Sequence, residues 1–86
     1  MLFVFDRPEV RSMWMKGMLV PIDIVWADEH GNIVKVYPNV QPVLGPKYSS
    51  IKPAKYAIEC AAGDAARLGL AEGSHIRIFG DVTNVD

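Results

Sequence analysis

The residues of this chain with the clearest chemical potential are charged side chains placed among large apolar residues. Lys16, Asp23 and Glu59 each lie inside or at the end of such an apolar run. Burying an unpaired charge costs free energy, so residues of this kind are solvated, paired or part of a site. Because Lys16 and Asp23 flank the short connection at residues 17–21, adjacent antiparallel strands would bring them together.

One interpretation of these residues is a small polar pocket beneath a loop at residues 39–53. Such a ligand-binding pocket would have the aromatic walls Trp14 and Tyr56 and the polar groups Lys16, Asp23, Gln41 and Glu59. In an enzyme, Asp23 and Glu59 would act as acid and base, with Lys16 stabilising developing negative charge. The alternative is structural: Lys16 pairs with Asp23 or Glu59 and fixes strand register, which is the more common use of charges in sheets.

The sequence carries no signature of a known catalytic chemistry. A Ser-His-Asp order, a His-x-x-x-His metal spacing and a phosphate-binding glycine loop are all absent. His30 and His75 are expected to be solvated, and Cys60, the only cysteine, is expected to be a small buried thiol that forms no intrachain disulfide. We therefore expect no metal and no cofactor. The favoured function is a non-catalytic module that binds a small molecule, a peptide or a protein, and a small hydrolase-like enzyme is the alternative.

Composition limits the class of protein. The 86 residues suffice for one domain, expected at residues 1–80 with a polar tail at 81–86, and half of them are hydrophobic. A net charge of -1, from nine basic and ten acidic residues, provides no basic face for nucleic acid. No apolar run approaches the about 18 residues of a membrane span, and the apolar first five residues lack the basic flank of a signal peptide. As written, the chain is expected in the cytoplasm.

Short strands dominate the expected secondary structure. Strands are predicted at 1–5, 10–16, 22–26, 33–37, 55–60 and 76–79. A helix is predicted at 61–70, with Gly69 suited to the left-handed C-terminal cap. The polar turn at 27–32 predicts a hairpin, whereas the prolines between 38 and 53 predict an irregular loop packed over the domain and anchored by Tyr48 or Ile51. The expected fold is mainly β (α+β): a small curved sheet or β-barrel of about six strands with one short helix near the C-terminus.

Five ordered blocks of the sequence resemble one known family. They are residues 1–6 (MLFVFD), 13–16 (MWMK), 21–24 (PIDI), 39–42 (NVQP) and 54–59 (AKYAIE) with 62–73 (AGDAARLGLAEG). The chain thereby resembles, from residue 1 to about residue 78, the uncharacterised prokaryotic family known as domain of unknown function 192. The family has no established activity, so the resemblance implies a fold and not a function. Its members are often exported, and they usually read Trp-Met-Lys-Asn-Thr where this chain has Gly17 and Met18 after Lys16.

The resemblance also implies an exposed sheet edge. Family members usually carry a further N-terminal segment with a strand before the part that matches residue 1. Without that strand, residues 1–5 or a neighbouring strand would present unpaired backbone groups, which favour pairing with another chain. We therefore expect a homodimer with Phe3 and Phe5 at the contact and Trp14 or Trp26 beside them. In a monomer, the tail at 80–86 would have to cover this edge.

Overall fold

The computed structural model describes residues 1–15 and 17–77, and Lys16 and residues 78–86 lie outside the described part. The elements in chain order are β1 (Leu2–Glu9), β2 (Ser12–Met13), β3 (Ile22–Ala27), β4 (Ile33–Val40), β5 (Tyr48–Ser49), β6 (Ala54–Ala61) and α1 (Asp64–Arg67). The six strands and one short helix of the described residues confirm the predicted mainly β fold class.

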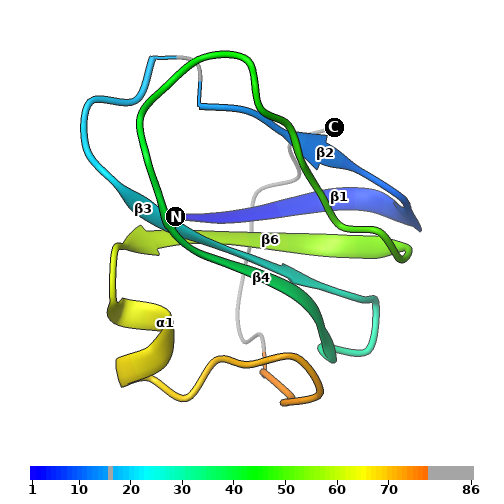
Figure 1. Cartoon of the computed structure of the whole chain (residues 1–86). Helices are drawn as coiled ribbons and strands as arrows, with labels where there is room; N and C mark the ends of the chain where they lie inside the picture. Colours follow the sequence, from blue (N-terminus) through cyan, green and yellow to red (C-terminus); the bar gives the residue numbers. More distant parts are fainter. Residues whose placement is uncertain (16, 78–86) are drawn as a thin grey trace.

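The strands form two antiparallel sheets (Figure 1). The larger sheet has the order β1-β6-β3-β4, and the smaller consists of β2 and β5. Within the described residues the larger sheet is not closed, since β1 and β4 each pair on one side only. The open curved sheet, and not the barrel, is therefore the form that the fold takes.

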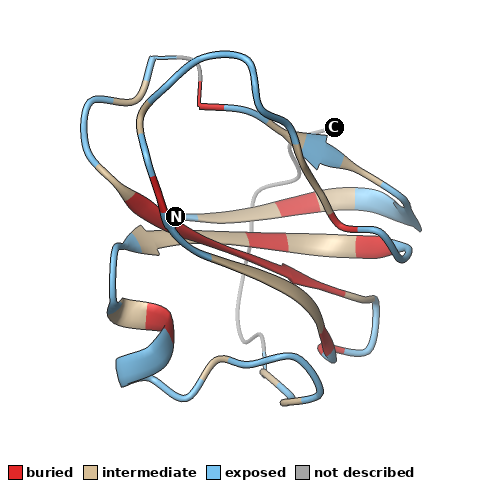
Figure 2. Cartoon of the chain, viewed as in Figure 1, coloured by how far each residue is buried: buried red, intermediate tan, exposed pale blue. Residues whose placement is uncertain are grey.

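Strand β3 forms the centre of the molecule because all six of its residues are buried (Figure 2). On one face of the sheet, Ile24 and Trp26 belong to an apolar core, and the partly buried Met13 and Tyr48 of the β2–β5 sheet pack against it. On the other face, Val25 packs in a second core with Ala65 of α1. The sheet is thus covered on one face by β2 and β5 and on the other by α1.

Two of the predicted strands, 1–5 and 33–37, continue past a proline. Pro8 lies inside β1 and Pro38 inside β4. Both strands are edges of the larger sheet, where a missing N–H group leaves no ladder bond unmade. The prediction of an irregular segment from 38 to 53 was wrong at its start, where β4 continues to Val40, and at residues 48–49, which form β5.

Other predicted elements changed in length. The strand expected at 10–16 is reduced to β2. Residues 76–77 form no strand, although His75 makes a single bridge to Asn32, and residues 78–86, including the rest of that strand and the expected tail, lie outside the described part. Of the two predicted loop anchors, Tyr48 packs into the domain and Ile51 does not. The ring centroids of Tyr48 and Tyr37 are 5.2 Å apart in an edge-to-face contact, whereas Ile51 is 60% exposed.

The helix is one turn, not the predicted ten residues. Gly63 precedes it in the left-handed conformation (φ 95°), so α1 begins only at Asp64. At the other end Gly69, also left-handed, donates to the Ala66 carbonyl at 3.2 Å, and Leu70 donates to the Ala65 carbonyl at 2.8 Å. These two bonds form a Schellman motif, so the predicted glycine cap is confirmed.

Candidate functional site

Asp23, the acidic residue of the predicted site, is fully buried on β3. Its Oδ1 accepts a hydrogen bond from the backbone N–H of Asn39 at 2.8 Å, and its Oδ2 accepts from Gly63 at 3.0 Å and Ala65 at 2.9 Å. A carboxylate that accepts several backbone N–H groups is stabilised as an anion without a basic side chain. Asp23 therefore joins β3 to the end of β4 and to α1, while its predicted partner Lys16 lies outside the described residues.

The register of β3 and β6 separates the two predicted carboxylates. Asp23 lies opposite Cys60, and Ile24 lies opposite Glu59. Since neighbouring residues of a strand point to opposite faces, Asp23 and Glu59 project from opposite faces of the sheet. The geometry thus does not assemble the acid–base pair that the hydrolase alternative requires.

The two titratable groups near this register are tuned by burial. Burial raises the pKa of Glu59, and the amino group of Met1 opposes that rise. Burial, followed by the charges of Asp23 and Asp64, raises the pKa of the Cys60 thiol. Because the thiolate is the reactive form, a raised thiol pKa disfavours a nucleophilic role for this cysteine.

The remaining predicted residues lie at separate places on the surface. Gln41 is exposed, and its Nε2 donates to the carbonyl oxygen and the Oδ1 of Asn39 at 3.2 and 3.1 Å. Tyr56 lines a pocket of about 280 Å³ formed with Glu29, His30, Gly31, His75, Ile76 and Arg77. Trp14 lines a different pocket. The five predicted residues that the structure describes therefore do not form one site.

The Trp14 pocket lies beside the smaller sheet. It has a volume of about 350 Å³ and is lined by Ser12, Met13, Trp14 and Lys47. Pairing of Met13 with Tyr48 places Lys47, the residue before β5, next to the β2 residues. The indole of Trp14 is 50% exposed, and Lys47 provides the only charge among the described lining residues. This pocket presents an apolar wall, a hydroxyl group and one positive charge.

The third pocket is larger but chemically less distinctive. It measures about 510 Å³ and is lined by Pro8, Asp28, Glu29, His30, Val34, Lys52 and Pro53. The Oδ1 of Asp28 already accepts from the backbone N–H groups of His30 and Asn32, each at 2.9 Å. Residues 1–15 and 17–77 contain no group of three His, Cys, Asp or Glu side chains able to hold a metal ion.

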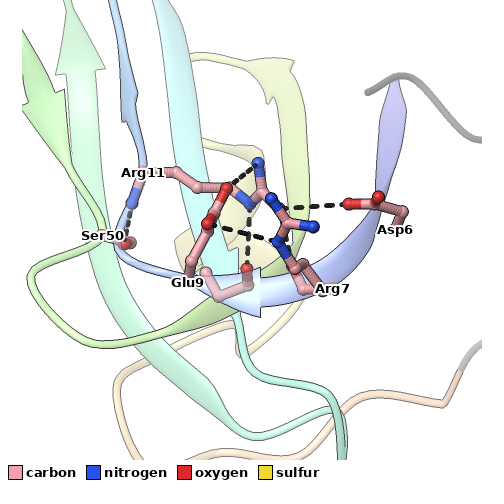
Figure 3. Close-up of polar contacts among 6 residues, drawn as sticks. Asp6, Arg7, Glu9, Arg11 and Ser50 are labelled. Atoms are coloured by element: carbon pink, nitrogen blue, oxygen red, sulfur yellow. Dashed lines mark hydrogen bonds and ion pairs between the residues drawn. The ribbon is translucent and has the colours of Figure 1, made fainter.

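Arg11 is the polar residue that the sequence interpretation missed (Figure 3). Its side chain is only 13% exposed and lies over the Phe5 ring, with Cζ 3.9 Å from the centroid. The guanidinium donates to the carbonyls of Arg7 at 2.6 Å and Ala54 at 3.2 Å, and it pairs with Glu9 at 3.4 Å. Arg11 thus connects the end of β1 to the start of β6.

The backbone of Arg11 extends this network to a buried serine. Its N–H donates to Ser50 Oγ at 2.9 Å (Figure 3). Its carbonyl accepts from the Ser50 N–H at 2.7 Å. Ser50 is fully buried, so these bonds satisfy polar groups that would otherwise be costly. A lone arginine before a short strand gives little signal in a sequence, since two of its side-chain partners are backbone carbonyls and one of these, Ala54, is 43 residues away.

Comparison with known structures places this fold among uncharacterised proteins. A structure from Sinorhizobium meliloti 1021, provisionally described as a transcription regulator, is 32% identical with a TM-score of 0.81. A protein of unknown function from Novosphingobium aromaticivorans DSM 12444 is 25% identical with a TM-score of 0.80. Each alignment covers 87% of this chain but only 58% and 54%, respectively, of those chains, so this chain spans little more than half of their length. None of the curated proteins compared with this chain matches it.

The family assignment rests on nearly the whole chain. No helix among the described residues is long and apolar enough to cross a membrane. Residues 1–78 match the family described as "Uncharacterized ACR", domain of unknown function 192, which confirms the resemblance found in the ordered sequence blocks. This chain belongs to the family known as domain of unknown function 192.

Proposed function

We propose that the protein is a non-catalytic binding module whose pocket at Ser12, Met13, Trp14 and Lys47 takes a small anionic ligand with a planar apolar body. One observation carries the proposal: a half-exposed indole lies in the same pocket of about 350 Å³ as a lysine that is its only described charge. This volume falls within the range of about 300–1,000 Å³ that small-molecule sites occupy.

The two tryptophans of the chain support a ligand role for one of them. Trp26 is fully buried and donates from Nε1 to the carbonyl of Tyr48 at 3.2 Å, so it is a core residue. Trp14 is 50% exposed, so a planar ligand can contact the accessible part of its ring. An ammonium group near the ring then favours a carboxylate on that ligand.

The proposal involves neither a metal nor a cofactor and favours no nucleic-acid partner. Although the Sinorhizobium meliloti structure is provisionally described as a transcription regulator, this chain has a net charge of -1. A peptide with a C-terminal carboxylate and an aromatic side chain has the same chemistry as the small anion. The hydrolase alternative lacks support from geometry, because Asp23 and Glu59 project from opposite faces of the sheet.

Isothermal titration with benzoate tests this proposal, with benzyl alcohol as the neutral ligand of the same ring. Benzoate should bind more tightly, and Lys47→Gln should remove that preference, because the substitution removes the pocket's described charge. Lys52→Gln is the matched control: Lys52 is also exposed but lines the larger pocket. Equal affinities for the two ligands, or equal effects of the two lysine substitutions, would refute the anionic pocket.

We also propose that two copies pair through β1. The supporting observation is the position of β1 at an edge of the larger sheet, with β6 as its neighbour on one side. Phe3 and Phe5 are partly buried against the core, so only part of each ring is accessible to a second copy. Trp26 is fully buried and is therefore not a contact residue.

A further inference from the structure

The end of the molecule beside the Trp14 pocket carries two apolar loops. The loop pair consists of residues 17–21, which precede β3, and residues 41–47, which connect β4 to β5. Ile22 pairs with Val40, so the two loops leave the sheet from the same end (Figure 1). The second loop ends at residue 47, directly before β5, which pairs with β2.

The loop pair exposes large aliphatic side chains. Leu19 is 89% exposed, Leu44 68%, Val20 59% and Val43 53%. Nine large apolar residues are exposed in the part of the chain that the structure describes, and four of the nine are in these loops. Such side chains on neighbouring loops indicate an interaction site more strongly than scattered ones do.

The shape of these loops is maintained by local bonds. Met18 packs against the core, and its N–H donates to the Met15 carbonyl at 3.2 Å. In the second loop, the Val43 N–H donates to the Gln41 carbonyl at 2.8 Å. Prolines 21, 42 and 46 further restrict the backbone. The aliphatic side chains are thus presented on partly ordered loops, which lose less conformational entropy on binding.

Charge selects the partner. Residues 17–21 and 41–47 contain no aspartate or glutamate, although the whole chain has ten, and Lys47 is the charge in the loop pair. Aliphatic tips, a half-exposed tryptophan behind them and a nearby lysine are the side chains that favour the boundary of an anionic lipid bilayer. Protein interfaces, in contrast, favour aromatic residues and arginine at their centre.

We propose that the loop pair docks on an anionic membrane surface, with Leu19 and Leu44 entering the acyl boundary and Lys47 facing lipid headgroups. In this proposal the loop pair contacts one surface of the bilayer and does not span it. The inference does not depend on the pocket ligand, because its main contacts are residues outside the pocket lining.

Flotation of the full chain with lipid vesicles tests this inference. The protein should float with vesicles of phosphatidylcholine and phosphatidylglycerol and much less with phosphatidylcholine alone. The double substitution Leu19→Ser/Leu44→Ser should weaken the partition by about a hundredfold, since burying each leucine is worth about one decade of binding. Lys47→Gln should weaken it by about fivefold and reduce its salt dependence.

Leu68→Ser is the matched control, because Leu68 is 56% exposed but lies at the end of α1. It should leave flotation unchanged. A circular-dichroism spectrum and a urea unfolding midpoint equal to those of the wild-type chain would show that the double variant is folded. The proposal is overturned if the wild-type chain fails to float, or if the double variant and Leu68→Ser float equally. A third result would also overturn it: the wild-type chain does not bind vesicles, and Leu19→Ser/Leu44→Ser abolishes its self-association. The loop pair would then be a contact between two copies of the chain.

Discussion

Asp23 Oδ2 accepts a hydrogen bond from the backbone N–H of Ala65 at 2.9 Å, so a buried charge in the central strand holds the helix against the sheet. The same carboxylate also binds Gly63 in the turn before α1 and Asn39 near the end of β4. Three parts of the chain that are distant in sequence therefore meet at one side chain. This arrangement gives Asp23 a structural role in the fold.

Replacing Asp23 with asparagine should lower the free energy of unfolding by about 2–4 kcal/mol. The asparagine amide has one acceptor oxygen, and its NH2 group would face an N–H donor that Asp23 now satisfies. Urea unfolding measures the loss. Asp64→Asn is the control, because Asp64 is a carboxylate of α1 with a side chain that is 35% exposed, and the substitution should cost less than about 1 kcal/mol. Similar losses in the two variants would contradict the structural role of Asp23.

Glu59→Gln should stabilise the protein near neutral pH. Folding raises the pKa of this carboxyl through burial, so the charged form costs stability above its unfolded pKa of about 4.3. The gain should be less than about 1 kcal/mol, because solvent screens a partly buried side chain, and it should vanish as the pH falls below 4.3 or so. Unfolding at several pH values checks both points. A wild-type chain more stable than the variant at neutral pH would show that the sign is wrong.

Arg11→Lys should destabilise the protein by about 1–3 kcal/mol. Lysine retains the charge but cannot reach the carbonyls of Arg7 and Ala54 with the planar fork of a guanidinium. Arg7→Lys provides the comparison, because the Arg7 side chain is 70% exposed and its replacement should change stability by less than about 0.5 kcal/mol. Thermal unfolding that ranks Arg7→Lys as the more damaging substitution would exclude Arg11 as the main connector.

Sequence reasoning succeeded where the structure depends on neighbouring residues. The hairpin between β3 and β4 was predicted from its polar turn, and the structure shows the local cause. Asp28 Oδ1 accepts from two backbone N–H groups of the turn, and Gly31 adopts a positive φ of 86°. A side chain at Gly31 would overlap the carbonyl oxygen of Ile76, so both the positive φ and the close backbone contact require glycine here.

Prediction failed where the structure depends on contacts between distant segments. The sequence marked Asp23 as a charge in an apolar strand, but its donors lie 16, 40 and 42 residues away. The short β2–β5 pair has only two residues on each strand, too few to produce a periodic pattern. Of the five predicted site residues that the structure describes, Trp14 alone lines the proposed pocket, while Asp23 and Glu59 fall on opposite faces.

The proposed homodimer predicts twice the chain mass of 9.5 kDa in solution. Pairing through the edge of β1 would satisfy backbone groups that otherwise contact water, and a stable interface should bury more than about 1,000 Å² in total. Sedimentation equilibrium at micromolar concentration gives the mass directly. A single species of 9.5 kDa would exclude the dimer.

The most direct test of the proposed binding function is a benzoate titration of the ¹⁵N-labelled protein, followed by NMR through its two tryptophan indole resonances. Trp14 lines the pocket and Trp26 is fully buried, so the two signals serve as probe and internal reference. We predict that benzoate shifts the Trp14 resonance in a saturable way, leaves the Trp26 resonance in place, and has no such effect on the Lys47→Gln variant. No saturable shift at Trp14, or the same shift with benzyl alcohol, would contradict the anionic pocket.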